Sequence, residues 1–565
     1  MKTGELRQIH KLDILLSRIV TFFALINFFL LFLSINTNVL LIRYYTLLTM
    51  TVFLVYLLVH EFSQHFGWPR ILRRLPDILM IIFLLVMHPP VKLYLFYILG
   101  RQTIAGIRDF SLAYEHRQKV SIFEQMSSNP PGYFMISFLL VISLGTMLLM
   151  LPAASATGAE TPFIDALFTA TSATCVTGLI VYDTGTYFSL FGQLVILSLI
   201  QIGALGIMTI SASFFVIIGQ KLRMHSESLL QNVIGEDNRF DMMNLIKHIV
   251  VVTISIEIVG AMLMYLNFRK DFGAGLGTIY TSVFHSISAF CNAGFSLYSD
   301  NLMRWYNDVW INLIFCGLII IGGIGFPVIQ DVLRMIRRKQ KYIHLSLHTK
   351  IVLLTTLLLI VCGTVLYFLS EYNNTMQDYS LSERILASFF QSVTTRTAGF
   401  NTIDNSTLSD SSVLTSLFLM FVGASPGSTG GGVKTTAFFI LLATVIAMFK
   451  GRRNVTAFSR RISQDLVKRA ISLVTVSASL LVIMIFFLLS FEHSSFEKVI
   501  FEAFSAFATV GLSMGITADL THSGRIIIIL LMYLGRVGPL TLGFAISQRM
   551  KKTQFEYIEE KINIG

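Results

Sequence analysis

Four short segments of this chain end in a glycine whose backbone suits cation binding. In each segment a phenylalanine stands ten residues before the glycine, and a leucine or phenylalanine follows it. The four glycines are Gly178, Gly294, Gly399 and Gly511. Glycine lacks a Cβ atom, so it adopts positive φ and can turn its carbonyl oxygen toward an axis. Rings of carbonyls replace the water shell of an ion in selective pores. The recurring pattern therefore predicts a selectivity filter rather than four unrelated tight turns.

The predicted filter also includes the residues that lead into each glycine, which we expect to face the ion with their backbone carbonyls. They are Thr174, Cys175, Val176, Thr177 and Gly178 in the first segment, Cys291, Asn292, Ala293 and Gly294 in the second, Thr397, Ala398 and Gly399 in the third, and Thr509, Val510 and Gly511 in the fourth. The ligand that this arrangement predicts is a dehydrated cation.

A second unusual stretch, residues 421–434, holds five glycines, one proline and three hydroxyl side chains. The apolar runs on either side, 412–422 and 437–448, are each shorter than the ~20 residues that span a bilayer. Irregular backbone at membrane depth is tolerated only where protein buries it or where it lines a watery cavity. We therefore predict a broken helix whose loop, 423–433, faces a pore. A surface loop between two short helices is the alternative. A phosphate-binding P-loop is excluded, because Val433 separates Gly432 from Lys434.

The composition places the chain in a membrane. Of its 565 residues 54% are hydrophobic and 13% are charged, against about 25% charged in soluble domains. The net charge of +11 is expected in cytoplasmic loops and is no sign of nucleic-acid binding. The four cysteines lie in apolar or pore-like stretches without paired spacing, so neither a disulfide nor a zinc site is expected.

The elements that must position the filter repeat along the chain. We predict an all-α polytopic protein in which each repeat consists of a membrane helix, a short pore helix with its glycine turn, and a second membrane helix. Four such repeats would surround a pseudo-fourfold pore. The predicted divisions are an N-terminal membrane extension at 1–130, repeats at 131–217, 243–334, 348–449 and 467–549, and a cytoplasmic tail at 550–565. For 1–130 two topologies stay open: a hairpin bent at Pro89–Pro90, or an N-terminus outside the cell.

Charged residues suggest the orientation. The linkers 334–350 and 450–469 are strongly basic, so they are expected in the cytoplasm. Acidic residues gather on the opposite side, where they would concentrate cations at an outer mouth or simply solvate loops. They are Glu160, Asp165, Asp183, Glu371, Asp378, Asp404, Asp410, Glu492 and Asp519.

Three ionisable residues fall at membrane depth, where charges are costly and usually functional or paired. Arg396, three residues before Gly399, is expected to brace the filter from behind by donating to carbonyls or to an acid. Arg536 falls in the middle of a predicted helix over 531–546. Glu257, inside the first helix of the second repeat, has no partner that the sequence reveals.

The motifs resemble the Trk/Ktr/HKT superfamily of potassium transporters, in particular bacterial membrane subunits of the KtrB/TrkH type. The resemblance covers about 129–548 and rests on residues 172–179, 288–295, 396–402, 425–434 and 535–541. It implies potassium uptake across the bacterial inner (plasma) membrane through a filter with one glycine per repeat. Cys175 stands where many members have threonine, which leaves the backbone carbonyl unaffected.

The resemblance also implies a gating loop in the third repeat and partners. The gate would consist of Gly423, Ser425, Gly427, Ser428, Thr429, Gly430, Gly431, Gly432, Lys434 and Arg536. Arg536 would hold the loop through its carbonyls. The implied partners are membrane lipid, a second copy of the chain in a homodimer, and a ring of nucleotide-binding cytoplasmic subunits of the KtrA/TrkA type. No cofactor is expected in the chain itself, only K⁺ or Na⁺ as the transported ion.

Two other classes of protein deserve comparison. A sodium-coupled or Na⁺-permeable secondary transporter would alternate access around a discontinuous helix, but it predicts inverted repeats, whereas these repeats look parallel. An enzyme is not expected, because the chain has no zinc-protease, nucleophile-elbow or nucleotide-binding motif.

Overall fold

The computed structural model describes residues 130–224, 237–337 and 345–538. The predicted N-terminal extension, the cytoplasmic tail and the end of the fourth repeat lie outside these residues. All contacts reported below belong to one compact unit, 131–565.

The described residues are mainly helical, and one order of elements recurs. A first helix is followed by a short helix that leads into one of the four glycines Gly178, Gly294, Gly399 and Gly511. The first helices are α6 (Pro130–Leu149), α10 (Asp237–Phe272), α14 (Leu347–Glu371) and α18 (Gln464–Phe491). The short helices are α7 (Phe163–Thr174), α11 (Leu276–Phe290), α15 (Leu381–Thr394) and α19 (Phe496–Ala508).

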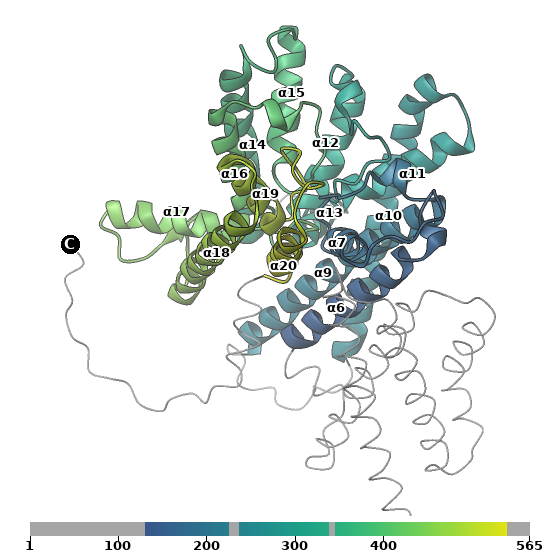
Figure 1. Ribbon diagram of the computed structural model, residues 1–565. Coiled ribbons are helices and arrows are strands. Elements are labelled where there is room, and N and C mark those ends of the chain that lie inside the picture. Colours follow the sequence, from purple (N-terminus) through teal and green to yellow (C-terminus); the bar gives the residue numbers. More distant parts are fainter. Residues whose placement is uncertain (1–129, 225–236, 338–344, 539–565) are drawn as a thin grey trace, which may run out of the picture. The chain divides into compact units, whose positions relative to one another are not determined.

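Each short helix is followed by a further helix after the glycine turn. These helices are α9 (Leu190–Met224), preceded by the one-turn α8 (Thr184–Tyr187), then α12 (Val309–Ile324) with α13 (Phe326–Arg337), α16 (Asp410–Val422) with α17 (Thr435–Phe449), and α20 (His522–Val537). The helix of the third group is broken between α16 and α17, where the flanking apolar runs place the break. Figure 1 shows α7 beside α20, and the two are in contact although they come from opposite ends of the described chain.

Several described helices have the length and composition of membrane spans. Ile246–Phe272 within α10, Leu347–Glu371 and Gln464–Phe491 each qualify alone. The pair α12 and α13 qualifies together but bends by 101° at Gly325. Large apolar side chains stand exposed along these helices, among them Val251, Ile258 and Met262 of α10. In a membrane protein such a face meets lipid instead of water.

The short helices are enclosed by the other helices. Polar side chains that cap the helices define where several of them begin. Ser380 and Glu383 form a capping box at the start of α15, each side chain accepting from the other's backbone N–H. Ser409 caps α16 and Ser463 caps α18 in the simpler way. Each such cap contributes about 1 kcal/mol to helix stability.

One small β-element departs from the all-α prediction. Strands β1 (Thr456–Ala457) and β2 (Arg460–Arg461) pair antiparallel inside the basic linker 450–469. The two turn residues, Phe458 and Ser459, have φ of 48° and 60°. Positive φ at both central positions is the backbone of a tight hairpin turn that matches the twist of its strands. The turn lacks the usual glycine or asparagine, which is why the sequence did not suggest it.

Candidate functional site

The four glycine segments share an unusual backbone. In each, the residue two before the glycine has positive φ, and so does the glycine itself. The φ values are 57° and 97° at Val176 and Gly178, 59° and 70° at Asn292 and Gly294, 79° and 78° at Thr397 and Gly399, and 51° and 92° at Thr509 and Gly511. Non-glycine residues seldom adopt positive φ, and it costs of order 1–3 kcal/mol unless the surroundings enforce it. Four matching occurrences indicate one enforced arrangement.

Each of the four glycines packs directly against the backbone of a neighbouring segment. A Cβ atom built on each would overlap a carbonyl oxygen of the next segment. The distances would be 2.4 Å from Gly178 to Ala293, 2.9 Å from Gly294 to Ala398, 2.5 Å from Gly399 to Val510 and 2.1 Å from Gly511 to Thr177. The contacts run from the first segment to the second, third, fourth and back to the first. The four segments therefore close a ring of backbone in which only glycine fits.

Hydroxyl side chains near the ends of the short helices support this ring. The Ser172 and Ser505 hydroxyl oxygens each accept from the N–H of their segment's glycine at 3.1 Å. The Ser288 hydroxyl donates to the Phe295 carbonyl at 2.8 Å, and Thr394 donates to Phe400 at 2.5 Å. Sequence reasoning missed these residues. Their signal was a serine six residues before the glycine in three of the four segments.

The glycine-rich loop lies against the ring and is buried, which excludes the surface-loop alternative. A Cβ on Gly430 would lie 2.0 Å from the Thr397 hydroxyl oxygen, and one on Gly431 would lie 2.5 Å from that of Thr509. The loop thus packs under the third and fourth segments. This position is available only to residues without side chains.

Backbone hydrogen bonds tie the loop to the bend between α12 and α13. The N–H groups of Ser425 and Thr429 donate to the carbonyls of Gly323 and Gly322, at 3.1 and 3.3 Å. The Phe326 N–H donates back to the Gly427 carbonyl at 2.9 Å. Carbonyls in the last turn of a helix have no partner within the helix, so the loop supplies it. We expected Arg536 to hold the loop through its carbonyls, and the structure shows this additional anchor.

Two cationic side chains also hold the loop. Arg536 is buried and donates from its two terminal nitrogens to the Thr429 carbonyl and, at 3.4 Å, to the Gly203 carbonyl of α9. The Lys434 ammonium donates to the Gly430 carbonyl at 2.7 Å. The predicted mid-helix position of Arg536 is wrong. It lies in the last turn of α20, which ends at Val537 because Gly538 takes a φ of 87°.

The other buried charges have partners that differ from those expected. Arg396 donates to the Thr356 hydroxyl at 3.5 Å, rather than to the carbonyl or acid that we predicted. Glu257 does have partners. It accepts from the Gln201 amide at 3.2 Å and contacts the Cys291 thiol at 3.8 Å. Glu257 therefore contacts the second of the four glycine segments.

Part of the predicted acidic mouth is internal. Asp165 is buried, accepts from the Tyr182 hydroxyl at 2.9 Å and forms an ion pair with Arg525 of α20. Glu371 and Glu492 are also buried and cap neighbouring N–H and hydroxyl groups, at Ser409 and at Thr521 respectively. These three carboxylates hold helices together and do not form a free surface charge.

This geometry can be compared with known proteins. A model of the TrkH family, described as cation transport proteins, matches residues 111–556. The Ktr system potassium uptake protein B of Bacillus subtilis is 40% identical over 450 residues, which cover 79% of this chain and 99% of that protein. The chain belongs to the TrkH family. The resemblance predicted from the motifs is thereby confirmed.

Further comparisons place this TrkH-family chain among uptake proteins. The potassium/sodium uptake protein NtpJ of Enterococcus hirae is 40% identical over 444 residues, covering 77% of this chain and 97% of that protein. The solved structure of the potassium transporter TrkH from Vibrio parahaemolyticus has the same fold, with a TM-score of 0.62 and 17% identity over 84% of this chain and 95% of that one.

Proposed function

We propose that this TrkH-family protein takes up potassium across the bacterial inner membrane through a pore formed by four repeats. The observation that carries the proposal is the closed ring of filter glycines, in which each glycine faces the carbonyl of the next segment. In each repeat the short helix is the pore helix and the helices around it span the membrane. A ring of backbone carbonyls can replace the water shell of a monovalent cation.

The residues around each glycine would hold the ion by their carbonyl oxygens. Alternating positive φ, at the glycine and two residues before it, turns successive peptide groups so that carbonyls can face the same axis. No side chain needs to touch the ion, so the cysteine at Cys175 is compatible with a potassium site.

The glycine-rich loop would act as the gate. It packs beneath Thr397 and Thr509 and is held by Arg536, Lys434 and the bend at Gly325. A positive charge beside the ion path also repels a waiting cation. Release of these bonds would let the loop leave the path. Because the bend continues into α13, a movement of that helix would reach the loop directly.

A Na⁺-permeable or sodium-coupled transporter is the second candidate. One relative, at 40% identity, is named a potassium/sodium uptake protein. The filter contacts are made by backbone, which ligates Na⁺ as well as K⁺ when the ring can contract. The ratio of K⁺ to Na⁺ influx decides between the two functions.

Regulation would come from partners. We propose a homodimer whose cytoplasmic side docks a ring of nucleotide-binding subunits, and two relatives at 38–40% identity are named as parts of a Ktr system. Four exposed arginines, Arg452, Arg453, Arg460 and Arg461, lie on or near the β-hairpin. They form a basic surface suited to an acidic partner or to anionic lipid headgroups.

The filter is tested by ion influx into proteoliposomes with K⁺, Rb⁺ and Na⁺ compared. Gly399→Ser and Gly294→Ser should lower the preference for K⁺ while the protein still inserts. Gly273→Ser is the matched control, because Gly273 has the same φ of 78° as Gly399 but no atom within 4 Å of a built Cβ. Unchanged ion ratios in both filter variants would remove the filter assignment.

The gate is tested by Arg536→Ala and by a partial deletion within 427–432. Both should raise K⁺ influx and weaken its regulation while the K⁺ preference survives, since the filter ring is left intact. Lys450→Ala, which removes an exposed cation beyond α17, should change nothing. Loss of influx from both gate variants, in well-inserted protein, would show that the loop supports the pore instead of closing it.

A further inference from the structure

The second and fourth filter segments share a polar link that the first and third lack. Nine residues before Gly294 stands His285 of α11, and nine residues before Gly511 stands Glu502 of α19. Both side chains are fully buried. Each accepts a hydrogen bond from the serine two residues after its own glycine, at 3.1 Å for Ser296 and 2.8 Å for Ser513.

The hydrogen bonds around His285 define its role as an acceptor. Its Nδ1 lies 2.8 Å from the Thr281 carbonyl, which can only accept, so Nδ1 carries the proton. Nε2 is then free to accept from the Ser296 hydroxyl and, at 3.4 Å, from the Leu297 N–H. The Ser296 oxygen in turn accepts from the Tyr298 N–H at 3.0 Å. The short helix therefore pins a turn that begins just beyond the filter glycine.

Glu502 pins the corresponding turn of the fourth segment. Its carboxylate accepts from the hydroxyls of Ser513 and Thr517. The Ser513 oxygen accepts from the Gly515 N–H at 3.0 Å, two residues further on, as Ser296 does in the second segment. A histidine and a glutamate thus fill the same acceptor role in two repeats.

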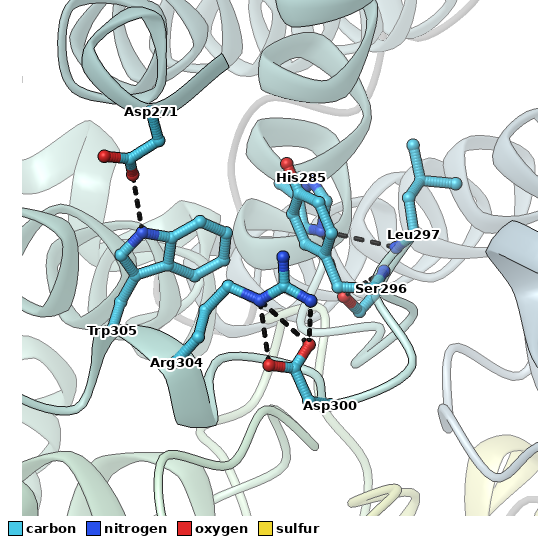
Figure 2. Close-up of polar contacts among 8 residues, drawn as sticks. Asp271, His285, Ser296, Leu297, Asp300, Arg304 and Trp305 are labelled. Carbon is cyan, nitrogen blue, oxygen red and sulfur yellow. Dashed lines mark hydrogen bonds and ion pairs between the residues drawn. The ribbon is translucent and has the colours of Figure 1, made fainter.

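An outer cluster secures the second segment further (Figure 2). Arg304 donates to both carboxylate oxygens of Asp300, and the Trp305 indole donates to Asp271, at the end of α10, at 2.8 Å. The Tyr298 ring stacks on His285 at 5.1 Å, and the Arg304 guanidinium lies over Tyr298 at 4.8 Å. The segment beyond Gly294 is therefore held both by the short helix α11 and by this cluster around Arg304 and Trp305.

The first and third segments have other residues at the matched positions. Thr169 bonds back to the Asp165 carbonyl of its own helix at 2.9 Å, and Phe390 is apolar. Apart from the Ser172 bond with Gly178 and the Thr394 bond to Phe400, the polar links of these two short helices reach later parts of the outgoing segment, from Asp165 to Tyr182 and from Gln391 to Asn405. Because the ring contacts run in the order first, second, third, fourth, the two pinned segments face each other across the axis.

We propose that His285 and Glu502 are positioning residues for ion selectivity, which fix the outer ends of two opposite filter segments through Ser296 and Ser513. This inference rests on the filter proposed above. A ring whose width is held across one diagonal cannot contract around the smaller Na⁺, so loss of the links should admit Na⁺ without closing the path to K⁺.

The test measures the ratio of K⁺ to Na⁺ influx in proteoliposomes of the full chain. Ser296→Ala and Ser513→Ala each remove one donor with little change in volume, and each should lower the ratio about threefold to tenfold, the size expected for one buried hydrogen bond. His285→Asn, whose amide is too short to replace Nε2, should do the same. His285→Gln places an acceptor oxygen near the Nε2 position, so it should keep the ratio of K⁺ to Na⁺ influx close to that of the starting protein, in contrast to His285→Asn. Thr169→Val, at the matched position of the first repeat, should leave it unchanged.

The outcomes separate this inference from the filter proposal. If Gly399→Ser lowers the ratio and both serine variants stay within twofold of the starting protein, the positioning role is wrong and the filter stands. An equal fall in Thr169→Val or in His285→Gln would also overturn it, because loss of general packing would then explain the effect. If Gly399→Ser leaves the ratio unchanged, the filter itself fails.

Discussion

Alanine at the four filter glycines should damage selectivity in an order set by the ring geometry. Alanine adds only the Cβ atom whose neighbours are known. That atom would lie 2.1 Å from a carbonyl oxygen at Gly511, 2.4 Å at Gly178, 2.5 Å at Gly399 and 2.9 Å at Gly294. Real Cβ atoms do not approach oxygen to within 3 Å, so the backbone of the neighbouring segment must move in every case, furthest for Gly511→Ala and least for Gly294→Ala.

The loss of K⁺ preference has one part that is common to all four alanine variants and one part that differs among them. All four glycines have φ between 70° and 97°, and a left-handed backbone costs an L-residue roughly 1–2 kcal/mol. If this strain falls on the K⁺-loaded ring, it alone lowers the K⁺ preference by roughly fivefold to thirtyfold, since 1.4 kcal/mol is a factor of about ten. Displacement of the neighbouring carbonyl adds to this loss and should make Gly511→Ala the most severe variant.

Initial rates of K⁺ and Na⁺ influx into proteoliposomes, normalised to inserted protein, measure the order. Gly273→Ala serves as the control, because it carries the same backbone strain in open space. A K⁺ preference that is unchanged in Gly511→Ala would refute the ring as the selectivity element. The reverse order, with Gly294→Ala the most damaged, would show that the contacts between segments do not govern selectivity.

Three further predictions concern the bend, the outer cluster and the cytoplasmic face. In Gly325→Ala the added Cβ would lie 2.6 Å from the Pro426 carbonyl oxygen, at a residue with a φ of 91°. This substitution should displace the loop and raise K⁺ influx under conditions in which the gate is closed. Influx equal to that of the starting protein would argue against coupling between the bend and the loop. Hydrogen bonds from Arg304 hold the pKa of the Asp300 carboxyl below its usual range. A lowered pKa in the folded protein means that the pair stabilises above the unfolded-state value of about 3.9 and is lost only as pH falls through the lower folded value. Thermal midpoints of Asp300→Asn and the starting protein should therefore differ by the same small amount from pH 8 to about pH 5 and converge only in stronger acid, and convergence already at neutral pH would contradict this. Replacement of the four hairpin arginines by glutamine should weaken binding of nucleotide-dependent regulatory subunits in pull-down from native membranes and leave the ion ratio unchanged, whereas undiminished binding would exclude this surface as the docking site.

Local patterns in the sequence were enough to locate the main parts of the site. The four short helices, the glycines that follow them and the break between α16 and α17 all lie where apolar run lengths and glycine positions predict them. These features depend on near neighbours along the chain, so a pattern records them. The end of α20 can also be predicted from the sequence, because Gly538 precedes Pro539 and such a pair commonly ends a helix. The predicted helix over 531–546 continues past this glycine, whereas α20 spans His522–Val537 and ends before it; residues 539–546 lie outside the described part of the chain.

The partners of each residue were decided by the tertiary structure. No local signal in the sequence connects Asp165 with Arg525, Arg536 with the Thr429 carbonyl, or Gly430 with Thr397. Backbone carbonyls are partners that every residue offers, so the sequence cannot show which one a buried arginine will reach. The same limit explains why Arg396 was assigned to a carbonyl or an acid and is bonded to a hydroxyl. A residue type states what a side chain can donate or accept, and only the packing of distant segments determines which groups come within hydrogen-bonding distance.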